Sequence, residues 1–280
     1  MGSNPTLSAI LYHTIHIFMR HDFAELSRLF EEVVRDGVAH WLSPDSAHYQ
    51  ITLQFAIGRL VEGEQLAEFF RRRNVSGRVL DLGAGNGGVS AGMANYPDEY
   101  SVTTLDIVPN NDLRTLREKT GLPMTQTVGS GHYLPYKNGS FDLVLCLDTI
   151  EHVPEPKLLA PEIMRVLKPG GLCMITTPPR LRYWFARDPH YGIPALCLLP
   201  DGLQRVVGKW RLGGKAEYDV VHIFWSVGEL ARLFPGDKQV EVLFNRQLQP
   251  QGNLLERLAF RMRDFFWDRI VITKRRSAGK

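Results

Sequence analysis

An apolar run that breaks into glycines is the feature that most constrains the fold of this chain. Residues 79–88 read Val-Leu-Asp-Leu-Gly-Ala-Gly-Asn-Gly-Gly. Val79 and Leu80 predict a buried strand, and the glycines let the backbone turn with no side chain between main chain and ligand. Asp106 follows Gly83 by 23 residues, at the end of a second apolar run. Open α/β sheets bind ligands at the carboxyl ends of their strands, so this pairing predicts a nucleoside site with Asp106 on the ribose hydroxyls.

The order of residues in this turn narrows the choice of ligand. A dinucleotide-binding turn reads G-x-G-x-x-G and places the pyrophosphate on a helix N-terminus. Here Asp81 precedes Gly83, Gly85 and Gly87, and its carboxylate would repel a pyrophosphate but attract an ammonium or a sulfonium. The segment resembles the D/E-x-G-x-G loop of the class I S-adenosylmethionine-dependent methyltransferases, which holds the amino-acid end of that cofactor.

Three further segments, in the order that this family has them, extend the resemblance over residues 77–177. Residues 129–136 and 140–144 look like the family's third and fourth strand region, and residues 148–153 resemble its "LEHV" segment. Residues 165–171 match its "R-x-LKPGG" turn. The resemblance implies a Rossmann-like α/β fold, with a doubly wound, mostly parallel seven-stranded sheet and helices on both faces.

The hydrophobic pattern predicts the elements of this sheet in order. We expect strands near 78–82, 101–106, 124–128, 141–147 and 171–177, with helices near 87–95, 111–119 and 156–167. A helix at 226–234 and strands at 239–244 and 269–273 follow. Strands separated by helices imply right-handed crossovers and a parallel sheet.

Residues 1–76 are predicted to form an N-terminal helical cap. One amphipathic helix is expected over residues 6–37, with a break near His21 and Asp22. A second helix should run from Ser43 as its cap, with Pro44 at its first position, to about Arg73. The cap either covers an edge of the sheet or closes over the substrate.

Residues 77–280 are predicted to form the Rossmann-like methyltransferase domain, with two additions. Residues 178–221 follow the fifth strand and form an insertion that either shapes the substrate side of the site or is a surface excursion. Residues 252–267 form a helical insertion with arginines beside aromatic residues. This helix either packs with a solvated basic face or lies on a membrane surface.

Composition and charge favour a cytoplasmic protein that does not bind nucleic acid. The formal net charge is only +3, so bulk electrostatics does not demand a nucleic-acid partner. Cys146, Cys173 and Cys197 form no C-x-x-C pair, and the first two fall in expected core strands, where a thiol acts as a small hydrophobe. No apolar run approaches the roughly 20 residues of a membrane helix, and no basic residue precedes the apolar stretch at 7–19.

The resemblance assigns the cofactor, S-adenosylmethionine, to named residues. Asp81 should face its amino-acid end, directly or through water, while Asp106 takes the ribose hydroxyls and Ile107 packs on the adenine. Ser130 stands where the family often has an acid near the adenine amino group. The full predicted binding set is Asp81, Gly83, Gly85, Asn86, Asp106, Ile107, Ser130, Gly131, Leu147 and Asp148.

Methyl transfer from a sulfonium requires positioning more than activation. The enzyme holds the acceptor atom about 3–3.5 Å from the methyl carbon, so no metal or covalent residue is obligatory. A phenol or alcohol acceptor must lose a proton, and His152, His190 and His222 are the candidate bases. We predict no metal, although Asp148, Glu151 and His152 resemble the E-x-x-E-H cluster of some quinone O-methyltransferases and would be the set for a divalent ion.

The predicted function is methyl transfer from S-adenosylmethionine to a small or lipid-like acceptor at oxygen. The aromatic insertion and the helical cap favour a mainly apolar acceptor. Methylation of a small molecule at nitrogen or carbon, different chemistry with the same cofactor, and a binding protein that keeps the fold without turnover are the alternatives.

Overall fold

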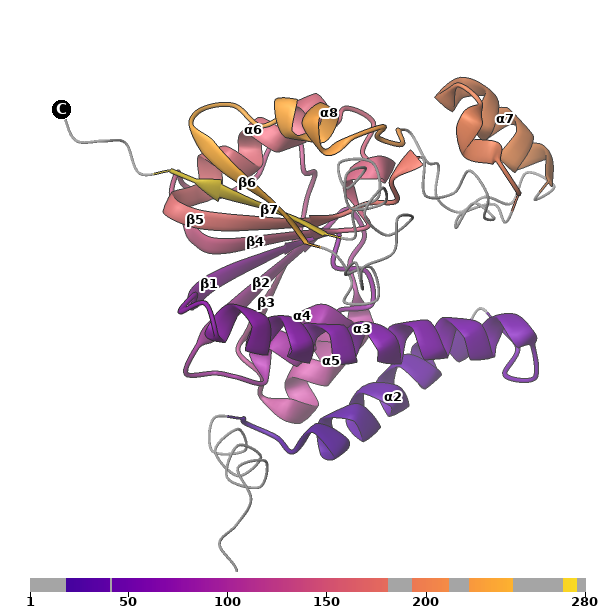
Figure 1. Cartoon of the computed structure of the whole chain (residues 1–280). Coiled ribbons are helices and arrows are strands. Elements are labelled where there is room, and N and C mark those ends of the chain that lie inside the picture. Colours follow the sequence, from indigo (N-terminus) through magenta and orange to yellow (C-terminus); the bar gives the residue numbers. More distant parts are fainter. Residues whose placement is uncertain (1–18, 41, 181–192, 212–221, 244–268, 276–280) are drawn as a thin grey trace, which may run out of the picture. The chain divides into compact units, whose positions relative to one another are not determined.

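The structure, a computed structural model, describes residues 19–40, 42–180, 193–211, 222–243 and 269–275. Its strands form a seven-stranded sheet in the order β3-β2-β1-β4-β5-β7-β6 (Figure 1). The pairings of β1 with β2, of β2 with β3 and of β4 with β5 are parallel. This sheet with its helices confirms the predicted α/β fold class. The chain divides into two compact units, residues 1–129 and 130–280. The predicted domain boundary between residues 76 and 77 stays a prediction.

The first unit contains three parallel strands, β1 (Gly77–Leu82), β2 (Tyr100–Asp106) and β3 (Met124–Val128). In register, Asp81 pairs with Thr104 and Asp106 pairs with Val128. Helices α4 (Gly88–Ala94) and α5 (Asn111–Thr120) follow β1 and β2, as predicted. The strand interiors are fully buried at Val79, Leu80 and Val102, because strands covered on both faces need apolar side chains on both.

Two helices precede β1. Helix α2 (Phe23–Ala39) buries an apolar stripe of Leu26, Phe30, Val33, Val34 and Val38. Residues 19–22 are not helical and α2 begins at Phe23, which agrees with the break expected near residues 21 and 22. Helix α3 (Ala47–Arg71) follows. The predicted helix over residues 6–18 lies outside the described residues.

The predicted start of the second helix at Ser43 is wrong by three residues. The side chain of Ser46 accepts a hydrogen bond from the backbone N–H of Tyr49 (3.1 Å), which makes Ser46 the N-cap. The Ser46 hydroxyl in turn donates to the carbonyl of Ser43 (2.7 Å). Pro44 therefore sits in a turn before the helix, and the second serine supplies the capping oxygen.

Helix α3 crosses α4 at glycines. A Cβ atom on Gly63 would lie 2.3 Å from the carbonyl oxygen of Val89, and one on Gly92 would lie 2.5 Å from the carbonyl oxygen of Leu60. A Cβ atom on Gly88 would lie 2.9 Å from the Cβ of Arg59. Only hydrogen fits at these positions, so the two helix backbones approach closely and α3 is held against the helix that follows the glycine turn.

The second unit holds β4 (Phe141–Leu147) and β5 (Leu167–Thr176) in parallel, with β7 (Arg269–Lys274) antiparallel to both β5 and β6 (Lys238–Leu243). A 3-10 turn η1 (Ile150–His152) and helix α6 (Pro156–Val166) connect β4 to β5. Short helix α8 (Val227–Arg232) precedes β6. Cys146 and Cys173 are fully buried in β4 and β5, as predicted for small apolar side chains.

The insertion after β5 is partly described. It contains η3 (Leu196–Leu198) and α7 (Asp201–Arg211), whereas residues 181–192 and 212–221 lie outside the described residues. The predicted helical insertion at 252–267 also lies outside them. Among the helices that are described, not one combines the length and the apolar character needed to cross a membrane.

Two glycine substitutions on α3 test the close contact between α3 and α4. Gly63→Ala should lower the free energy of unfolding by about 1–3 kcal/mol, since the added methyl group meets the backbone of α4. Gly58→Ala on the same helix, where a Cβ atom would meet nothing within 4 Å, should raise it by about 0.5–1 kcal/mol through helix propensity. Urea denaturation of both variants measures the difference, and equal effects would contradict the close crossing.

Candidate functional site

The glycine turn after β1 is held by two side chains, one at the end of β2 and one shortly after it. The carboxylate of Asp106 accepts a hydrogen bond from the backbone N–H of Gly85 (3.1 Å) through one oxygen and from that of Val108 (3.2 Å) through the other. The side-chain amide of Asn110 donates to the carbonyl of Gly85. Both backbone groups of Gly85 are thus bound to the β2–α5 segment, which fixes the turn beside the tip of β2.

The backbone of this turn has conformations that favour glycine. Gly83, Gly85 and Gly87 all have positive φ angles of 53–79°, where a side chain would be strained. A Cβ atom on Gly85 would meet nothing within 4 Å, so space is open on that side of the turn. Asn86 accepts a hydrogen bond from the N–H of Gly88 (3.0 Å) and stabilises the start of α4.

Asp81 lies beneath the turn and is only 3% exposed. Its carboxylate accepts a hydrogen bond from the hydroxyl of Ser90 on α4 (2.6 Å). Burial raises the pKa of Asp81 to about 6, against the lowering effects of the Ser90 hydroxyl and the Arg59 guanidinium. Asp81 is therefore a poorly solvated carboxylate whose charge a nearby cation would stabilise.

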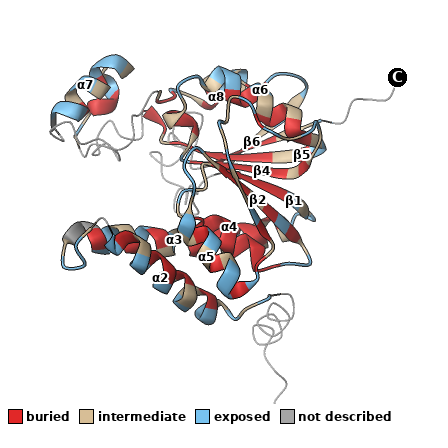
Figure 2. Ribbon diagram, turned by 180° about the vertical axis from the view of Figure 1, so that it is seen from behind, coloured by how far each residue is buried: buried red, intermediate tan, exposed pale blue. Residues whose placement is uncertain are grey.

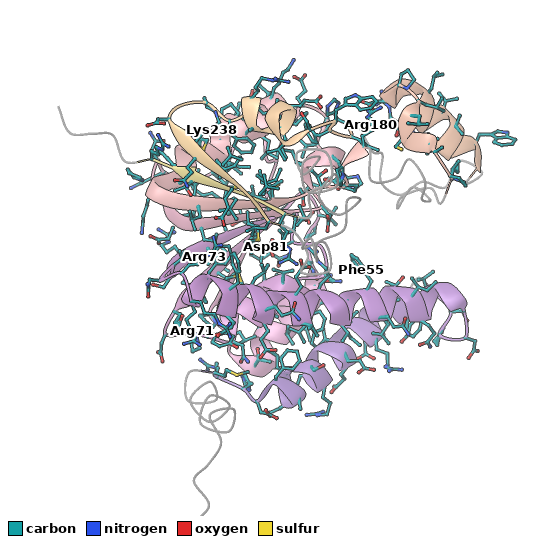
Figure 3. All side chains as sticks on the ribbon, viewed as in Figure 1. Phe55, Arg71, Arg73, Asp81, Arg180 and Lys238 are labelled. Carbon is teal, nitrogen blue, oxygen red and sulfur yellow. The ribbon has the colours of Figure 1, made fainter. Side chains whose placement is uncertain are left out.

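Helix α3 brings an ion pair and two exposed apolar side chains to the same unit. Arg59 and Glu62 are paired (2.6 Å), and the Cβ of Arg59 lies against Gly88 at the start of α4. Ile51 and Phe55 precede Arg59 at four-residue steps, so the three residues share one face of the helix. Ile51 and Phe55 are largely exposed, and Figure 3 labels Phe55 on α3.

In the second unit, the predicted residues at the end of β4 form a local arrangement of their own. Asp148 has a left-handed φ of 51°, which is strained for a residue other than glycine. The hydroxyl of Thr176 in β5 donates to the Asp148 carboxylate (2.9 Å), while the Asp148 N–H donates to Thr176. Leu147 is buried and Ser130 is exposed, with the Ser130 hydroxyl accepting from the N–H of His132 (3.2 Å).

His152 ends η1, at the predicted place after β4, where its N–H donates to the carbonyl of Thr149 (3.0 Å). Glu151 beside it is buried. Within the described ranges, no three His, Cys, Asp or Glu side chains gather closely enough to hold a metal ion, and these ranges include Asp148, Glu151 and His152. His190 lies outside the described residues.

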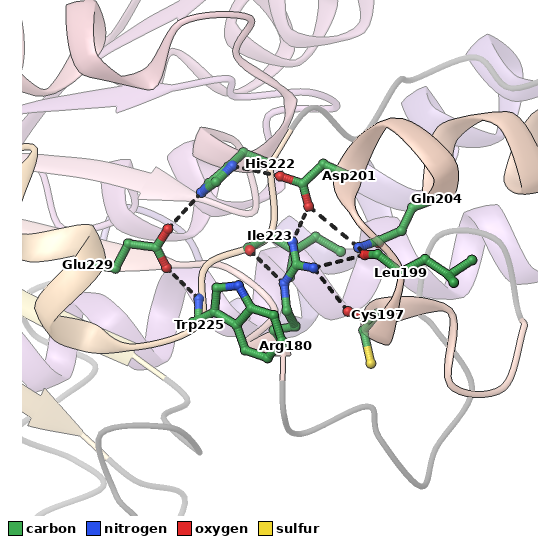
Figure 4. Close-up of polar contacts among 9 residues, drawn as sticks. All are labelled: Arg180, Cys197, Leu199, Asp201, Gln204, His222, Ile223, Trp225 and Glu229. Atoms are coloured by element: carbon green, nitrogen blue, oxygen red, sulfur yellow. Dashed lines mark hydrogen bonds and ion pairs between the residues drawn. The ribbon is translucent and has the colours of Figure 1, made fainter.

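A buried arginine organises the insertion after β5 (Figure 4). Arg180 is 3% exposed, and its guanidinium donates to the carbonyls of Ile223 (3.1 Å), Cys197 (3.1 Å) and Leu199 (2.9 Å). It also pairs with the carboxylate of Asp201 at the start of α7. A buried charge is stable only when it is paired and hydrogen-bonded in this way, so Arg180 ties α7 to the end of β5.

His222 extends this network. Its Nδ1 lies 2.8 Å from Asp201 and its Nε2 lies 3.1 Å from Glu229 on α8. The hydrogen bond with Asp201 is the main reason that the pKa of His222 is raised. Burial by itself would raise the pKa of Asp201, but the hydrogen bond from His222 and the charge of Arg180 outweigh it, and the pKa is lowered. Two carboxylates on one imidazole favour a structural, cationic His222 over a proton acceptor.

Sequence reasoning missed three participants in these arrangements. Ser90, which donates a hydrogen bond to Asp81, lies inside a helix where nothing in the sequence marks it. Asn110, which donates to the carbonyl of Gly85, resembles an ordinary helix cap. Arg180 follows two prolines in an irregular segment. The Asn110 side chain does cap α5, through a hydrogen bond from the N–H of Leu113 (3.0 Å). A capping asparagine four residues after the acid of β2 was the available signal.

Part of this chain is similar to known methyltransferases. Residues 80–175 match the family model described as "Methyltransferase domain". These residues are a class I methyltransferase domain. The matched segment of the methyltransferase domain begins inside β1 and ends inside β5, so it contains the glycine turn, Asp106 and the residues after β4.

Similar curated proteins match over the same part of the chain. A 2-methyl-6-phytyl-1,4-hydroquinone methyltransferase of Oryza sativa subsp. japonica is 32% identical over 39% of this chain and 33% of its own length. A ubiquinone biosynthesis O-methyltransferase of Proteus mirabilis is 32% identical over 39% of this chain and 45% of its own length. The match thus spans less than half of each relative. Among solved structures, a putative sarcosine dimethylglycine methyltransferase from Galdieria sulphuraria is similar over 76% of this chain and 84% of its own, at 20% identity and a TM-score of 0.48.

The buried Asp81 should make stability depend on pH. Its pKa is raised above the unfolded value of 3.8 to about 6, so its contribution to stability is fully present below about pH 4 and is lost as the pH rises through 6. From pH 4 to pH 8 the wild-type free energy of unfolding should fall by about 2–3 kcal/mol relative to that of Asp81→Asn. Denaturant unfolding at each pH measures this difference, and parallel profiles would contradict it.

Proposed function

We propose that this protein transfers the methyl group of S-adenosylmethionine to a small or lipid-like acceptor, at an oxygen atom. The observation that carries the proposal is the clamped glycine turn: Asp106 and Asn110 hold Gly85, with open space on its other side. This turn lies within the segment that matches the methyltransferase family.

The residues of the first unit fit the proposed cofactor. Each oxygen of Asp106 uses one lone pair on a backbone N–H and keeps another for a ribose hydroxyl. Ile107 is 72% exposed and offers an apolar surface for the adenine. Asp81 is buried under the turn, so we propose that it meets the ammonium end of the cofactor through a water molecule. A positive ligand there would favour the ionised carboxylate.

Four residues of the second unit are proposed to complete cofactor binding. Ser130 would accept a hydrogen bond from the adenine amino group. Gly131 follows it, at a position where a Cβ atom would lie 2.9 Å from the side chain of Leu159. Leu147 and Asp148 would border the methionine part. The strained backbone at Asp148 supports a functional role, since such strain is retained mainly where surrounding structure demands it.

The cofactor, when bound, supplies a methyl group that its sulfonium activates for in-line displacement. The chain's own contribution is to orient the two reactants and to receive one proton from the acceptor hydroxyl. We propose His152 as the base, since it follows β4 directly; His190 is the second candidate. His222 is already held by Asp201 and Glu229, so we assign it to the support of the insertion.

An apolar acceptor is supported by the exposed face of α3. Ile51 and Phe55 lie on the same face as Arg59, which abuts the start of α4 after the glycine turn. Burying both side chains against an acceptor would contribute about 1.5–3 kcal/mol each. The names of the curated relatives mention a phytyl-hydroquinone and ubiquinone biosynthesis, which agrees with a lipid-like acceptor.

Substitution of Asp106 tests the cofactor site. Asp106→Ala should weaken S-adenosylmethionine binding by about 1.5–3 kcal/mol, because charge-assisted hydrogen bonds to the ribose are lost. Isothermal titration calorimetry measures the dissociation constant. Asp98→Ala is the matched control, since it removes the same charge from an exposed position before β2 begins. An unchanged constant for Asp106→Ala would exclude the ribose role.

The acceptor can be identified by incubating the protein with a host metabolite extract and methyl-deuterated cofactor. Mass spectrometry should then find a species that gains the label, and fragmentation locates the methylated atom. Phe55→Ser should lower the yield of that species while leaving the cofactor dissociation constant unchanged. Binding without any labelled product would favour the non-catalytic alternative, and label on nitrogen or carbon would replace the oxygen assignment.

A further inference from the structure

Helix α7 has an inner face that is already packed. Gln204 is buried, and its side-chain amide donates to the carbonyl of Leu199 (2.7 Å). Val207 packs against a small apolar cluster formed by Leu196 and Ile223. The salt bridge between Arg180 and Asp201 fixes the first turn of the helix. These contacts define which side of α7 faces the protein.

The outer face of α7 carries large apolar side chains that are exposed to solvent. Leu203, Val206 and Trp210 are 52%, 64% and 81% exposed. Their spacing of three and four residues places them in one stripe along the helix. Figure 2 shows both buried and exposed residues along α7. A helix that needed only to cover the cluster of Leu196 and Ile223 would carry polar side chains on this outer stripe.

Basic residues border this apolar stripe. Lys209 lies three residues after Val206 and therefore beside it, and Arg205 lies four residues before Lys209 in the same row. The helix sequence ends Lys-Trp-Arg, which places the tryptophan between two basic residues. Apolar side chains with tryptophan on one face and basic residues beside them are typical of helices that lie in the interface of a membrane.

The size of the stripe favours a lipid surface over a protein partner. A tryptophan buries about 150–250 Å² at most and each aliphatic side chain less. Three such side chains stay well below the roughly 1,000 Å² that a stable protein interface requires. A bilayer needs no complementary shape, and anionic headgroups match the charge of Arg205 and Lys209.

We propose that the outer stripe of α7 binds the surface of an anionic lipid membrane. Leu203, Val206 and Trp210 enter the headgroup region, while Arg205 and Lys209 contact the phosphates. The salt bridge between Arg180 and Asp201 connects the membrane-bound helix α7 to the segment that follows β5. The inference goes beyond the proposed function, because it concerns where the enzyme works and uses none of the residues proposed to bind the cofactor.

Vesicle co-sedimentation of the full chain tests the proposal. Wild-type protein should bind vesicles of phosphatidylcholine with phosphatidylglycerol more tightly than vesicles of phosphatidylcholine alone, and high salt should remove the difference. The triple variant Leu203→Ser, Val206→Ser, Trp210→Ser should lower the partition constant at least about tenfold. All three side chains are exposed, so the thermal stability of the variant should match that of the wild type.

Two further variants keep the test sharp. Arg205→Gln with Lys209→Gln should reduce binding to the anionic vesicles by about fivefold for each charge and leave the apolar stripe intact. Leu158→Ser is the matched control, because it removes an exposed leucine from α6 and should bind as the wild type does. Calorimetry with S-adenosylmethionine on every variant tests the proposed function separately, since α7 is not part of that site.

Three outcomes would overturn the proposal while leaving the cofactor site unaffected. The first is a wild-type protein that does not bind the anionic vesicles. The second is a triple variant that binds them as tightly as the wild type does. The third is a wild-type dimer that the triple variant converts to a monomer with no change in vesicle binding, which would make the stripe a self-association surface.

Discussion

The hydrogen bonds between Asp106 and the turn after β1 are the interaction on which the proposed site depends. A glycine-rich turn has high conformational entropy, and here its central residue is fixed through both its N–H and its carbonyl. Asp106 ends the neighbouring strand and Asn110 follows it, so the parallel pairing of β1 with β2 brings both side chains into reach of the turn. Asp106 thereby shapes the turn before any ligand arrives, and its unused lone pairs remain for the ribose.

The buried carboxylate of Asp81 makes the same turn a favourable place for a positively charged ligand group. A carboxylate removed from water binds a proton more readily, which is why its pKa rises to about 6. The Ser90 hydroxyl offsets only part of this cost. In the proposed complex a cationic ligand would supply the missing stabilisation. Binding of the cofactor and ionisation of Asp81 would then be linked, and without ligand the contribution of Asp81 to stability would be smaller at neutral pH than at pH 4.

Two helices outside the central sheet are held in place by different kinds of contact. Helix α3 lies so close to α4 that Gly63 and Gly92 admit no side chain, and this contact fixes where Phe55 stands. Helix α7 depends instead on one buried arginine, Arg180, with Asp201 and His222 around it. The contact of α3 with α4 depends on steric fit, whereas the attachment of α7 depends on charged groups. Only the attachment of α7 should therefore change with pH.

The amino-acid sequence by itself determined the order and type of the central elements, because their apolar runs and glycine turns are local patterns. It placed Asp106 at the tip of β2 and predicted Cys146 and Cys173 in the core for the same reason. Local pattern failed at Ser43, where a second serine three residues later was the better cap. Only tertiary structure decided that Ser90 donates a hydrogen bond to Asp81 and that Asn110 donates one to Gly85. The same is true of the hydrogen bonds from Arg180 to the carbonyls of Cys197, Leu199 and Ile223. Those partners are distant in the chain, and a hydrogen bond between distant residues depends on packing that no local pattern records.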